Sequence, residues 1–231
     1  MTNPRIKLKV CGIKFLHNMR KVAQMKPDYL GFIFYEKSRR YMPDTLKPKD
    51  LQQLPKQIKK VGVFVNADTD KMLKQAKAYH IDVLQLHGQE SPEQCQAAKK
   101  AGFKVIKVFS LGQEDFDFKQ LEAYKPYVNY FLFDTAGKHP GGNGETFDWG
   151  QLRRYDQEVP FILSGGISLD NVPQLSALSF FNIHAIDVNS RFEIEPGLKD
   201  INLVQKLKDK LYGREEKKPG KKPFPSRQKN Q

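Results

Sequence analysis

The 231-residue chain alternates β-rich runs with segments of helical pattern, and the alternation repeats eight times. Such alternation is typical of a parallel sheet, because parallel strands need long crossover connections. The predicted strands are Ile6–Cys11, Tyr29–Phe34, Val61–Val65, Val83–His87, Lys104–Phe109, Tyr130–Asp134, Phe161–Ser164 and Ala185–Asn189. The predicted helices are His17–Met25, Pro48–Leu54, Thr69–Tyr79, Pro92–Ala101, Phe116–Ala123, Trp149–Tyr155, Leu169–Leu178 and Asp200–Leu211.

Eight strand–helix repeats in about 210 residues fit a closed (β/α)8 barrel of the TIM type. An open doubly wound sheet usually has fewer strands and binds ligands at a switch-point crevice. The first strand–helix junction, Cys11-Gly12-Ile13, also lacks the G-x-G-x-x-G fingerprint of dinucleotide sites. We therefore predict one α/β barrel domain over residues 1–212 and a basic, disordered tail over residues 213–231, where Pro, Gly and Lys dominate.

The composition is that of a soluble globular protein, with 39% hydrophobic and 28% charged residues. No apolar run approaches the roughly 20 residues that cross a bilayer, and the N-terminus lacks the apolar region of a signal peptide. The two cysteines, Cys11 and Cys95, are far apart and lack metal-ligand spacing. We therefore expect a cytoplasmic protein with reduced thiols, no metal, no cofactor and no membrane partner.

The net charge of +13 raises the question of a nucleic-acid partner, but +5 of it lies in the tail. The tail lysines could contact phosphates, and such binding would weaken steeply with salt. However, Phe224 is its one aromatic residue and no folded nucleic-acid motif is present. We therefore expect no nucleic-acid partner. The basic body either attracts an anionic substrate or is simply solvated.

Catalytic residues of such barrels lie at the carboxyl ends of the strands. Lys9 and Cys11 are two residues apart at the end of the first predicted strand, so they face the same side of it. A cation beside the thiol would lower the pKa of Cys11 and suit it to act as a general base. A small core hydrophobe is an equally good interpretation of this cysteine.

Three further polar residues follow predicted strands. Asp134 ends an apolar strand, where desolvation would raise its pKa and suit a general acid; the alternative is an aspartate that caps a loop. Arg40 offers a planar fork for a carboxylate or phosphate; the alternative is a solvated loop arginine. His87 shares a face with Gln85 and is interpreted as a structural histidine.

A phosphate site is predicted near the ends of the last two strands. Gly165 and Gly166 follow the seventh strand, and Asn189 and Ser190 follow the eighth, where this fold commonly binds phosphate. Glycines let backbone N–H groups approach an anion closely. The glycine-rich segment 141–144 follows the sixth strand and is suited to close over a ligand.

Beyond these local patterns, the chain resembles the phosphoribosylanthranilate isomerase family from about residue 6 to residue 211. Nine motifs occur in the family's order. They are KVCGI (9–13), GFIF (31–34), SRRY (38–41), VGVFVN (61–66), QLHG (85–88), FDT (133–135), GGxGxxFDW (141–149), LSGGI (163–167) and DVNS (187–190), the last with PGxKD at 196–200.

The resemblance implies an Amadori aldose–ketose rearrangement in L-tryptophan biosynthesis, without metal or redox cofactor. In this reaction, N-(5-phosphoribosyl)anthranilate becomes 1-(2-carboxyphenylamino)-1-deoxyribulose 5-phosphate. We expect a monomer or a homodimer. The resemblance implies Asp134 as the general acid, Cys11 as the general base, Arg40 as the ligand of the anthranilate carboxylate and Asp187 beside the anthranilate. The backbone amides that it assigns to the phosphate are those around Gly142, Gly144, Gly165, Gly166 and Ser190.

One departure and two rival families complete the sequence evidence. Arg191 replaces a glycine that many family members have beside the phosphate; it either contacts the phosphate or points to solvent. The isomerase of histidine biosynthesis shares the chemistry but is expected to have an aspartate where Cys11 stands. Indole-glycerol-phosphate synthase would need a catalytic lysine and an additional N-terminal helix, whereas five residues precede the first predicted strand.

Overall fold

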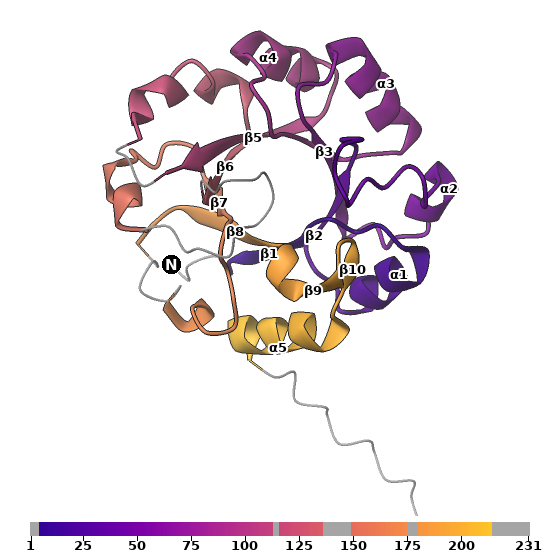
Figure 1. Ribbon diagram of the computed structural model, residues 1–231. Coiled ribbons are helices and arrows are strands. Elements are labelled where there is room, and N and C mark those ends of the chain that lie inside the picture. The colour runs from indigo at the N-terminus through magenta and orange to yellow at the C-terminus, as the bar shows by residue number, and fades with distance from the viewer. Residues whose placement is uncertain (1–4, 113–115, 136–148, 175–179, 214–231) are drawn as a thin grey trace, which may run out of the picture.

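The computed structural model describes residues 5–112, 116–135, 149–174 and 180–213. Eight parallel strands close into a barrel in chain order, because β1 pairs with both β2 and β8 (Figure 1). The predicted (β/α)8 fold is therefore confirmed. The strands are β1 (Lys7–Val10), β2 (Tyr29–Ile33), β3 (Lys59–Phe64), β4 (Val83–Leu86), β5 (Lys104–Leu111), β6 (Tyr130–Thr135), β7 (Phe161–Leu163) and β8 (Ile183–Val188).

Helices surround the barrel, and their starts follow the sequence signals. Asp68 caps α3 by accepting a hydrogen bond from the backbone N of Lys71. Ser91 and Gln94 form a capping box at the start of α4, with Pro92 as its first residue. The α-helices of the described residues are α1 (Leu16–Gln24), α2 (Pro48–Leu51), α3 (Thr69–Ala78), α4 (Pro92–Lys100) and α5 (Ile201–Tyr212).

The predicted α-helices after β5 and β6 are wrong in type. Short 3-10 turns occupy these connections: η1 (Phe118–Leu121), η2 (Lys125–Tyr127) and η3 (Trp149–Arg154). After β7, residues 169–171 form a turn and residues 172–174 a 3-10 turn, and residues 175–178 of that predicted helix lie outside the described residues. Gly150 and Pro173 lie inside two of the predicted helices and disfavour them, because glycine costs a helix about 1 kcal/mol and proline lacks an amide hydrogen. Pro126 lies after the predicted helix Phe116–Ala123, in η2.

The side chains of each strand alternate between two apolar layers. Strand residues that face outward pack beneath the helices and are among the largest fully buried side chains, including Phe32, Phe64, Phe131 and Phe133. The barrel interior is filled by a separate cluster that contains Tyr29, Val61, Val83, Ile106, Val108, Leu132, Ile162 and Ala185. This packed interior leaves the mouth of the barrel, at the carboxyl ends of the strands, as the place for a ligand.

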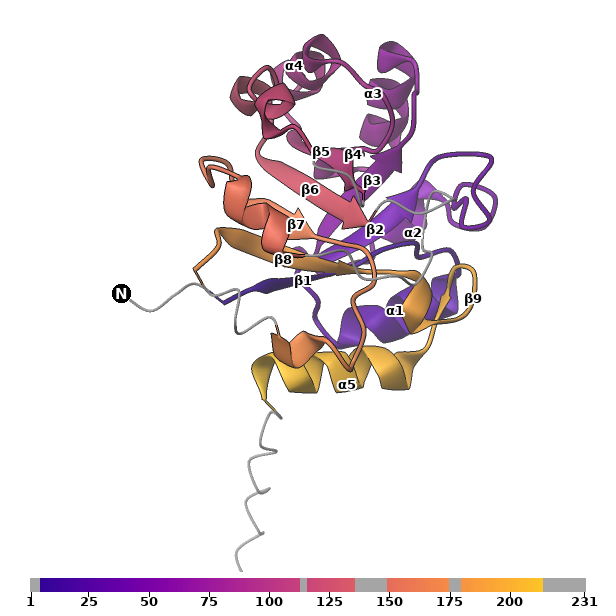
Figure 2. The same cartoon turned by 60° about the vertical axis from the view of Figure 1, so that its left-hand side comes forward.

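A short hairpin, formed by β9 (Glu193–Glu195) and β10 (Leu198–Lys199), follows β8 through the turn η5 (Ser190–Phe192). Figures 1 and 2 place the hairpin beside β1 and α1, where the side chain of Asn18 bonds both the backbone N and the backbone O of Lys199, at 2.8 and 2.9 Å. The hairpin is thus held at the edge of the barrel mouth.

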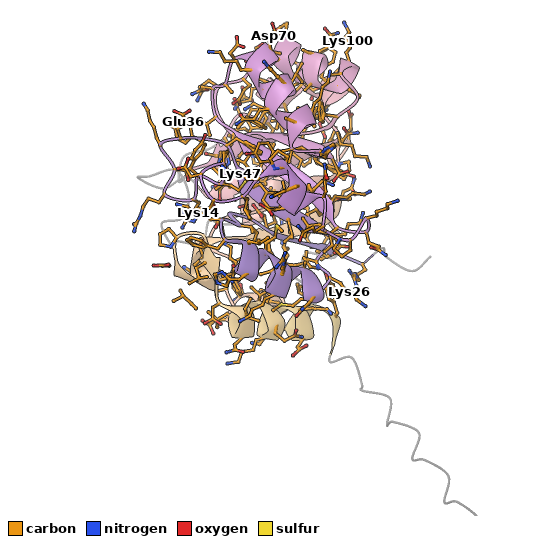
Figure 3. The ribbon with its side chains drawn as sticks, turned by 90° about the vertical axis from the view of Figure 1, so that its right-hand side faces the viewer. Lys14, Lys26, Glu36, Lys47, Asp70 and Lys100 are labelled. Carbon is orange, nitrogen blue, oxygen red and sulfur yellow. The ribbon has the colours of Figure 1, made fainter. Side chains whose placement is uncertain are left out.

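The outer surface carries charges of both signs. Figure 3 shows lysines of different helices and loops pointing outward, with Glu36 and Asp70 among them. The positive charge of the barrel is therefore spread over this side rather than gathered in one patch. Among the described residues, no helix is both long and apolar enough to cross a bilayer. The predicted boundary at residue 212 coincides with the end of α5, and residues 214–231 of the predicted tail lie outside the described residues.

Candidate active site

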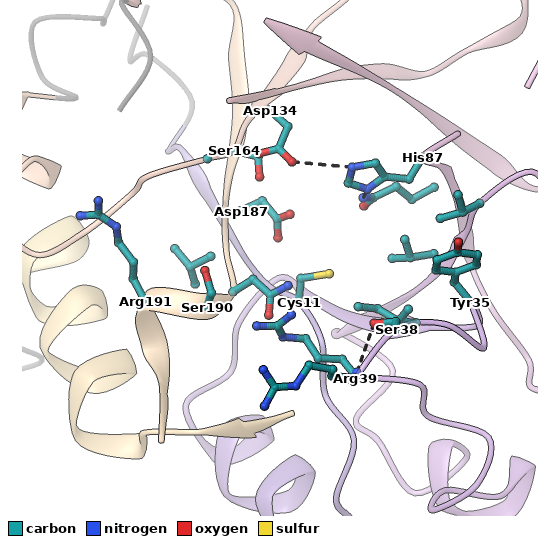
Figure 4. Close-up of a pocket in the computed structure, with 18 of the residues that line it drawn as sticks. Cys11, Tyr35, Ser38, Arg39, His87, Asp134, Ser164, Asp187, Ser190 and Arg191 are labelled. Atoms are coloured by element: carbon teal, nitrogen blue, oxygen red, sulfur yellow. Dashed lines mark hydrogen bonds and ion pairs between the residues drawn. The ribbon is translucent and has the colours of Figure 1, made fainter. Parts of the chain in front are cut away.

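A cavity of about 460 Å³ opens at the carboxyl ends of the barrel strands (Figure 4). Seven residues predicted from the sequence line it: Cys11, Arg40, Asp134, Gly165, Gly166, Asp187 and Ser190. The predicted Gly142 and Gly144 lie outside the described residues. Residues that sequence analysis did not single out for binding also line it, among them Tyr35, Lys37 and His87.

Cys11 is a free, buried thiol just after β1. Its backbone N donates to the carbonyl of Val188 at 2.9 Å, which fixes the end of the strand. Gly31 makes room for the sulfur, because a Cβ at that position would lie 2.6 Å from Sγ. Burial raises the pKa of the Cys11 thiol, although Lys9 and Lys199 act to lower it. Lys9 therefore acts in the predicted direction, but the predicted net lowering of the thiol pKa is wrong.

Lys9 and Asp187 form a buried ion pair inside the barrel mouth. The Nζ–Oδ1 distance is 2.9 Å, and the two side chains are 0% and 6% exposed. Burial alone would lower the pKa of Lys9, but Asp187 and Cys11 more than offset it, so the pKa is raised. A permanent ammonium group therefore lies close to both Asp187 and Cys11.

Asp134 at the end of β6 faces His87, which follows β4 (Figure 4). His87 Nε2 lies 3.6 Å from Asp134 Oδ2, and His87 Nδ1 lies 3.2 Å from Gln85 Nε2. The interpretation of His87 as purely structural missed this contact with the predicted acid. Its position at the end of β4, equivalent to that of Asp134 on β6, is the signal that could have found it.

Arg40 is held away from solvent by an acidic residue that sequence analysis did not select. Its Nε and Nη2 donate to both carboxylate oxygens of Glu193, at 2.7–3.0 Å. Lys199 Nζ donates to the same carboxylate at 2.6 Å. Gly12 lets these groups reach the end of β1, since a Cβ there would lie 2.8 Å from Arg40 Cδ. No motif of the sequence indicates that these residues meet, because they come from three separate segments.

The predicted phosphate side of the cavity combines the ends of β7 and β8. Gly165 and Gly166 have φ angles of +80° and +66°, which favour glycine. The side chain of Asn171 donates to the carbonyl of Gly166 at 2.9 Å and fixes this turn. Ser190 begins η5, and the exposed Arg191 extends from the same turn at the edge of the cavity (Figure 4).

The arrangement offers a thiol, a carboxyl group, an imidazole and several fixed cations around one cavity. Such a site suits proton transfers on an anionic substrate. Among the described residues, no three His, Cys, Asp or Glu side chains gather in a way that could hold a metal ion.

Comparison with known proteins identifies the relatives of this chain. Residues 8–210 match the family described as N-(5'phosphoribosyl)anthranilate (PRA) isomerase. The N-(5'-phosphoribosyl)anthranilate isomerase of Parabacteroides distasonis is 44% identical over 207 residues, which cover 87% of this chain and 92% of the relative.

Two solved structures extend this likeness to the fold. The phosphoribosyl anthranilate isomerase of Thermotoga maritima superposes with a TM-score of 0.78 at 31% identity, covering 90% of this chain and 100% of that one. A phosphoribosyl anthranilate isomerase in complex with reduced 1-(o-carboxyphenylamino)-1-deoxyribulose 5-phosphate has a TM-score of 0.74 at 30% identity, with the same coverage.

Proposed function

The chain belongs to the N-(5'-phosphoribosyl)anthranilate isomerase family, and we propose that Cys11 and Asp134 are the acid–base pair of its reaction. Its function is the aldose–ketose rearrangement of N-(5-phosphoribosyl)anthranilate in L-tryptophan biosynthesis. The product is 1-(2-carboxyphenylamino)-1-deoxyribulose 5-phosphate. Such a shift needs one acid and one base, and we expect it to need neither a metal nor a redox cofactor.

In the first step, Asp134 donates a proton to the ring oxygen of the ribose, and the furanose opens to a Schiff base. The reaction leaves a carboxylate on Asp134. The imidazole of His87, 3.6 Å away, is placed to stabilise this charge as it develops. This support from a neighbouring ring favours Asp134 as the acid.

In the second step, Cys11 removes the C2′ proton, and the resulting enolamine tautomerises to the ketone. A thiolate is the reactive form of this base. Because burial raises the thiol pKa, the positive charges of Lys9 and Lys199 must stabilise the thiolate. Cys11 follows β1 and Asp134 ends β6, so the two groups approach the substrate from different sides.

The remaining predicted residues hold the substrate. Arg40 binds the anthranilate carboxylate, and Asp187 borders the anthranilate. Backbone amides around Gly165, Gly166 and Ser190 bind the phosphate, together with those around Gly142 and Gly144 outside the described residues. The positive φ angles at Gly165 and Gly166 support this assignment, because such a turn can aim successive N–H groups at an anion.

The observation that carries the proposal is that the Cys11 thiol and the Asp134 carboxyl group line the same cavity at the barrel mouth. The test generates phosphoribosylanthranilate in situ from anthranilate and phosphoribosyl pyrophosphate with the transferase that joins them. Loss of the anthranilate-derived fluorescence then reports turnover. Wild type should react rapidly, and Cys11→Ser and Asp134→Asn should be nearly silent.

The buried Cys95 provides a matched control, since it is a second thiol in α4, outside the residues that line the cavity. Cys95→Ser should keep the wild-type rate. If folded wild-type protein does not turn over this substrate, the proposed function is wrong. We further propose that the enzyme works in the cytoplasm as a monomer or homodimer; size-exclusion chromatography with light scattering decides between these states.

A further inference from the structure

The guanidinium group of Arg40 is fixed along one edge and free along another. Nε lies 3.0 and 2.9 Å from the two carboxylate oxygens of Glu193, and Nη2 lies 2.7 Å from one of them. Among the residues that the structure describes, Nη1 forms no hydrogen bond. The side chain lines the cavity and is 14% exposed. Arg40 is thus oriented by Glu193 while keeping donors for a ligand.

Both carboxylate oxygens of Glu193 accept hydrogen bonds. Its side chain is 3% exposed, and Oε1 also accepts hydrogen bonds from Lys199 Nζ at 2.6 Å and from the backbone N of Gly197 at 3.0 Å. Burial alone would raise the pKa of Glu193, but Arg40 and Lys199 hold it below its ordinary value. Glu193 therefore stays a carboxylate at neutral pH.

Lys199 completes the network and ties it to the barrel. Its fully buried ammonium group donates to Glu193 and, at 2.7 and 3.3 Å, to the side-chain and backbone oxygens of Asn189. These three acceptors match the three donors of an ammonium group. Asn189 follows β8, and the backbone of Lys199 is held by Asn18 of α1. The orientation of Arg40 is therefore set by three segments of the fold.

The network carries one more positive charge than negative charge, because Arg40 and Lys199 share the single carboxylate of Glu193. The neighbouring ion pair of Lys9 and Asp187 is balanced within itself. Excess charge in a buried setting interacts strongly with a nearby anion, since little water screens it. Arg40 lines the cavity, and the planar guanidinium group matches the geometry of a carboxylate.

We propose that Glu193 and Lys199 are positioning residues that make this site selective for a ligand bearing a carboxylate. Glu193 fixes the orientation of Arg40, and Lys199 supplies the positive charge that the ligand carboxylate neutralises. The inference rests on the proposed function and deepens it, because it explains how the carboxylate of the anthranilate is recognised. Neither residue needs to touch the substrate.

The test compares two ligands that differ only in the carboxylate. One is reduced 1-(2-carboxyphenylamino)-1-deoxyribulose 5-phosphate, and the other is its phenylamino analogue without the carboxylate. Calorimetry gives the ratio of their affinities for wild type, Glu193→Gln and Lys199→Met. We expect wild type to prefer the carboxylate ligand and each variant to reduce this preference by about tenfold or more.

The two variants separate orientation from charge. In Lys199→Met, Arg40 keeps its contact with Glu193, but the excess positive charge disappears. In Glu193→Gln, Lys199 loses its carboxylate partner, and its pKa, which burial already lowers to about 8, falls further. A fall in that pKa favours the neutral amine of Lys199, which offsets the lost negative charge, while Arg40 loses the two-oxygen contact that orients it. With the substrate, both variants should raise KM, and both should also lower kcat, because the charge of Lys199 helps to stabilise the Cys11 thiolate.

A second buried pair serves as the control. Glu90 and Lys107 lie 3.0 Å apart, are 1% and 2% exposed, and are absent from the residues that line the cavity. Glu90→Gln removes the same charge from a similar setting, so it should lower stability without changing the ligand preference. Should Glu193→Gln unfold, Lys199→Met carries the test, with circular dichroism as the check on folding.

One result would overturn the inference: an unchanged ratio of the two affinities in folded variants, including the case in which both ligands bind equally more weakly. Turnover by wild type together with this result removes only the role of Glu193 and Lys199. Absence of turnover by wild type instead removes the proposed function itself.

Discussion

The two ends of the barrel use buried polar side chains in different ways. At the amino end, Tyr29 and Tyr130 begin β2 and β6, and His184 lies near the start of β8. Tyr29 Oη bonds His184 Nε2 at 2.7 Å, and the His184 ring stacks on Tyr130 with centroids 3.9 Å apart. Burial lowers the pKa of His184 to about 4, so this buried imidazole is uncharged at neutral pH. The carboxyl end instead contains buried ions, such as Lys9 with Asp187.

The difference shows which end is built for stability and which for chemistry. A buried neutral group needs only a hydrogen-bond partner, whereas a buried charge has a desolvation cost that pairing barely offsets. The amino end therefore closes the barrel with aromatic side chains at little cost. Charges that line the cavity are best explained by their use on a substrate, because well-packed apolar residues would stabilise that region as well or better.

The largest effect that sharpens this comparison is the loss of catalysis in Cys11→Ser. A general base contributes about 10²–10⁴-fold, so kcat should fall by at least that range while the melting temperature stays close to that of wild type. Tyr29→Phe should instead keep the kcat of wild type and lower the free energy of unfolding by about 1 kcal/mol, because His184 loses its hydrogen bond. Steady-state kinetics and thermal unfolding of both variants give the result. A Tyr29→Phe variant that loses most of its activity would contradict the division between the two ends.

A smaller effect is expected on the Cys11 thiol in Lys9→Met. Lys9 lowers the pKa of this thiol, so removing its charge should raise that pKa further. Thiolate absorbance at 240 nm against pH measures the shift, in a Cys95→Ser background that leaves one thiol. Stability should also fall, by about 3 kcal/mol, because Asp187 loses its buried partner.

Lys107→Met is the matched control for that titration. Lys107 is equally buried but pairs with Glu90, which is absent from the cavity lining. It should lower stability and leave the Cys11 titration unchanged. An unchanged titration in Lys9→Met as well would show that Lys9 does not tune the thiol.

The barrel could be predicted from the sequence because each strand is an apolar run closed by turn residues, and β2 to β6 lie within two residues of the prediction. The connections after β5 and β6 could not be predicted, since a short helical pattern does not distinguish an α-helix from consecutive 3-10 turns, and Gly150 weakens the second pattern. The sequence also predicted Cys11 and Asp134 as catalytic candidates, because a thiol or a carboxyl group at the end of a strand can be recognised from a single residue.

Side-chain contacts between distant segments could not be predicted from the sequence. Arg40 and Glu193 are 153 positions apart, and nothing in either segment shows that they form a bidentate contact. The pKa of Cys11 was predicted in the wrong direction for a related reason. The neighbouring Lys9 is visible in the sequence, but the complete burial that outweighs it depends on how Gly31 and β8 pack against the thiol.

The smallest expected effect concerns the pH dependence of stability at the amino end. The pKa of His184 is about 4 in the folded protein and about 6.5 when unfolded, so below pH 6.5 the unfolded chain binds the additional proton. Folding stability from this residue is therefore complete above pH 6.5 and is lost as the pH falls toward 4. Because the ring is partly exposed, we expect the loss to be about 1 kcal/mol.

His184→Phe should remove this slope while leaving kcat at neutral pH unchanged. The variant should be less stable than wild type at pH 7, because Tyr29 loses its hydrogen-bond partner, and the difference should shrink as the pH falls toward 4. Urea unfolding followed by circular dichroism at half-unit intervals measures both curves. His17→Phe, at an exposed position, is the control and should run parallel to wild type. If the free energy of unfolding of His184→Phe changes with pH as that of wild type does, the stability of the amino end does not depend on an uncharged His184 imidazole.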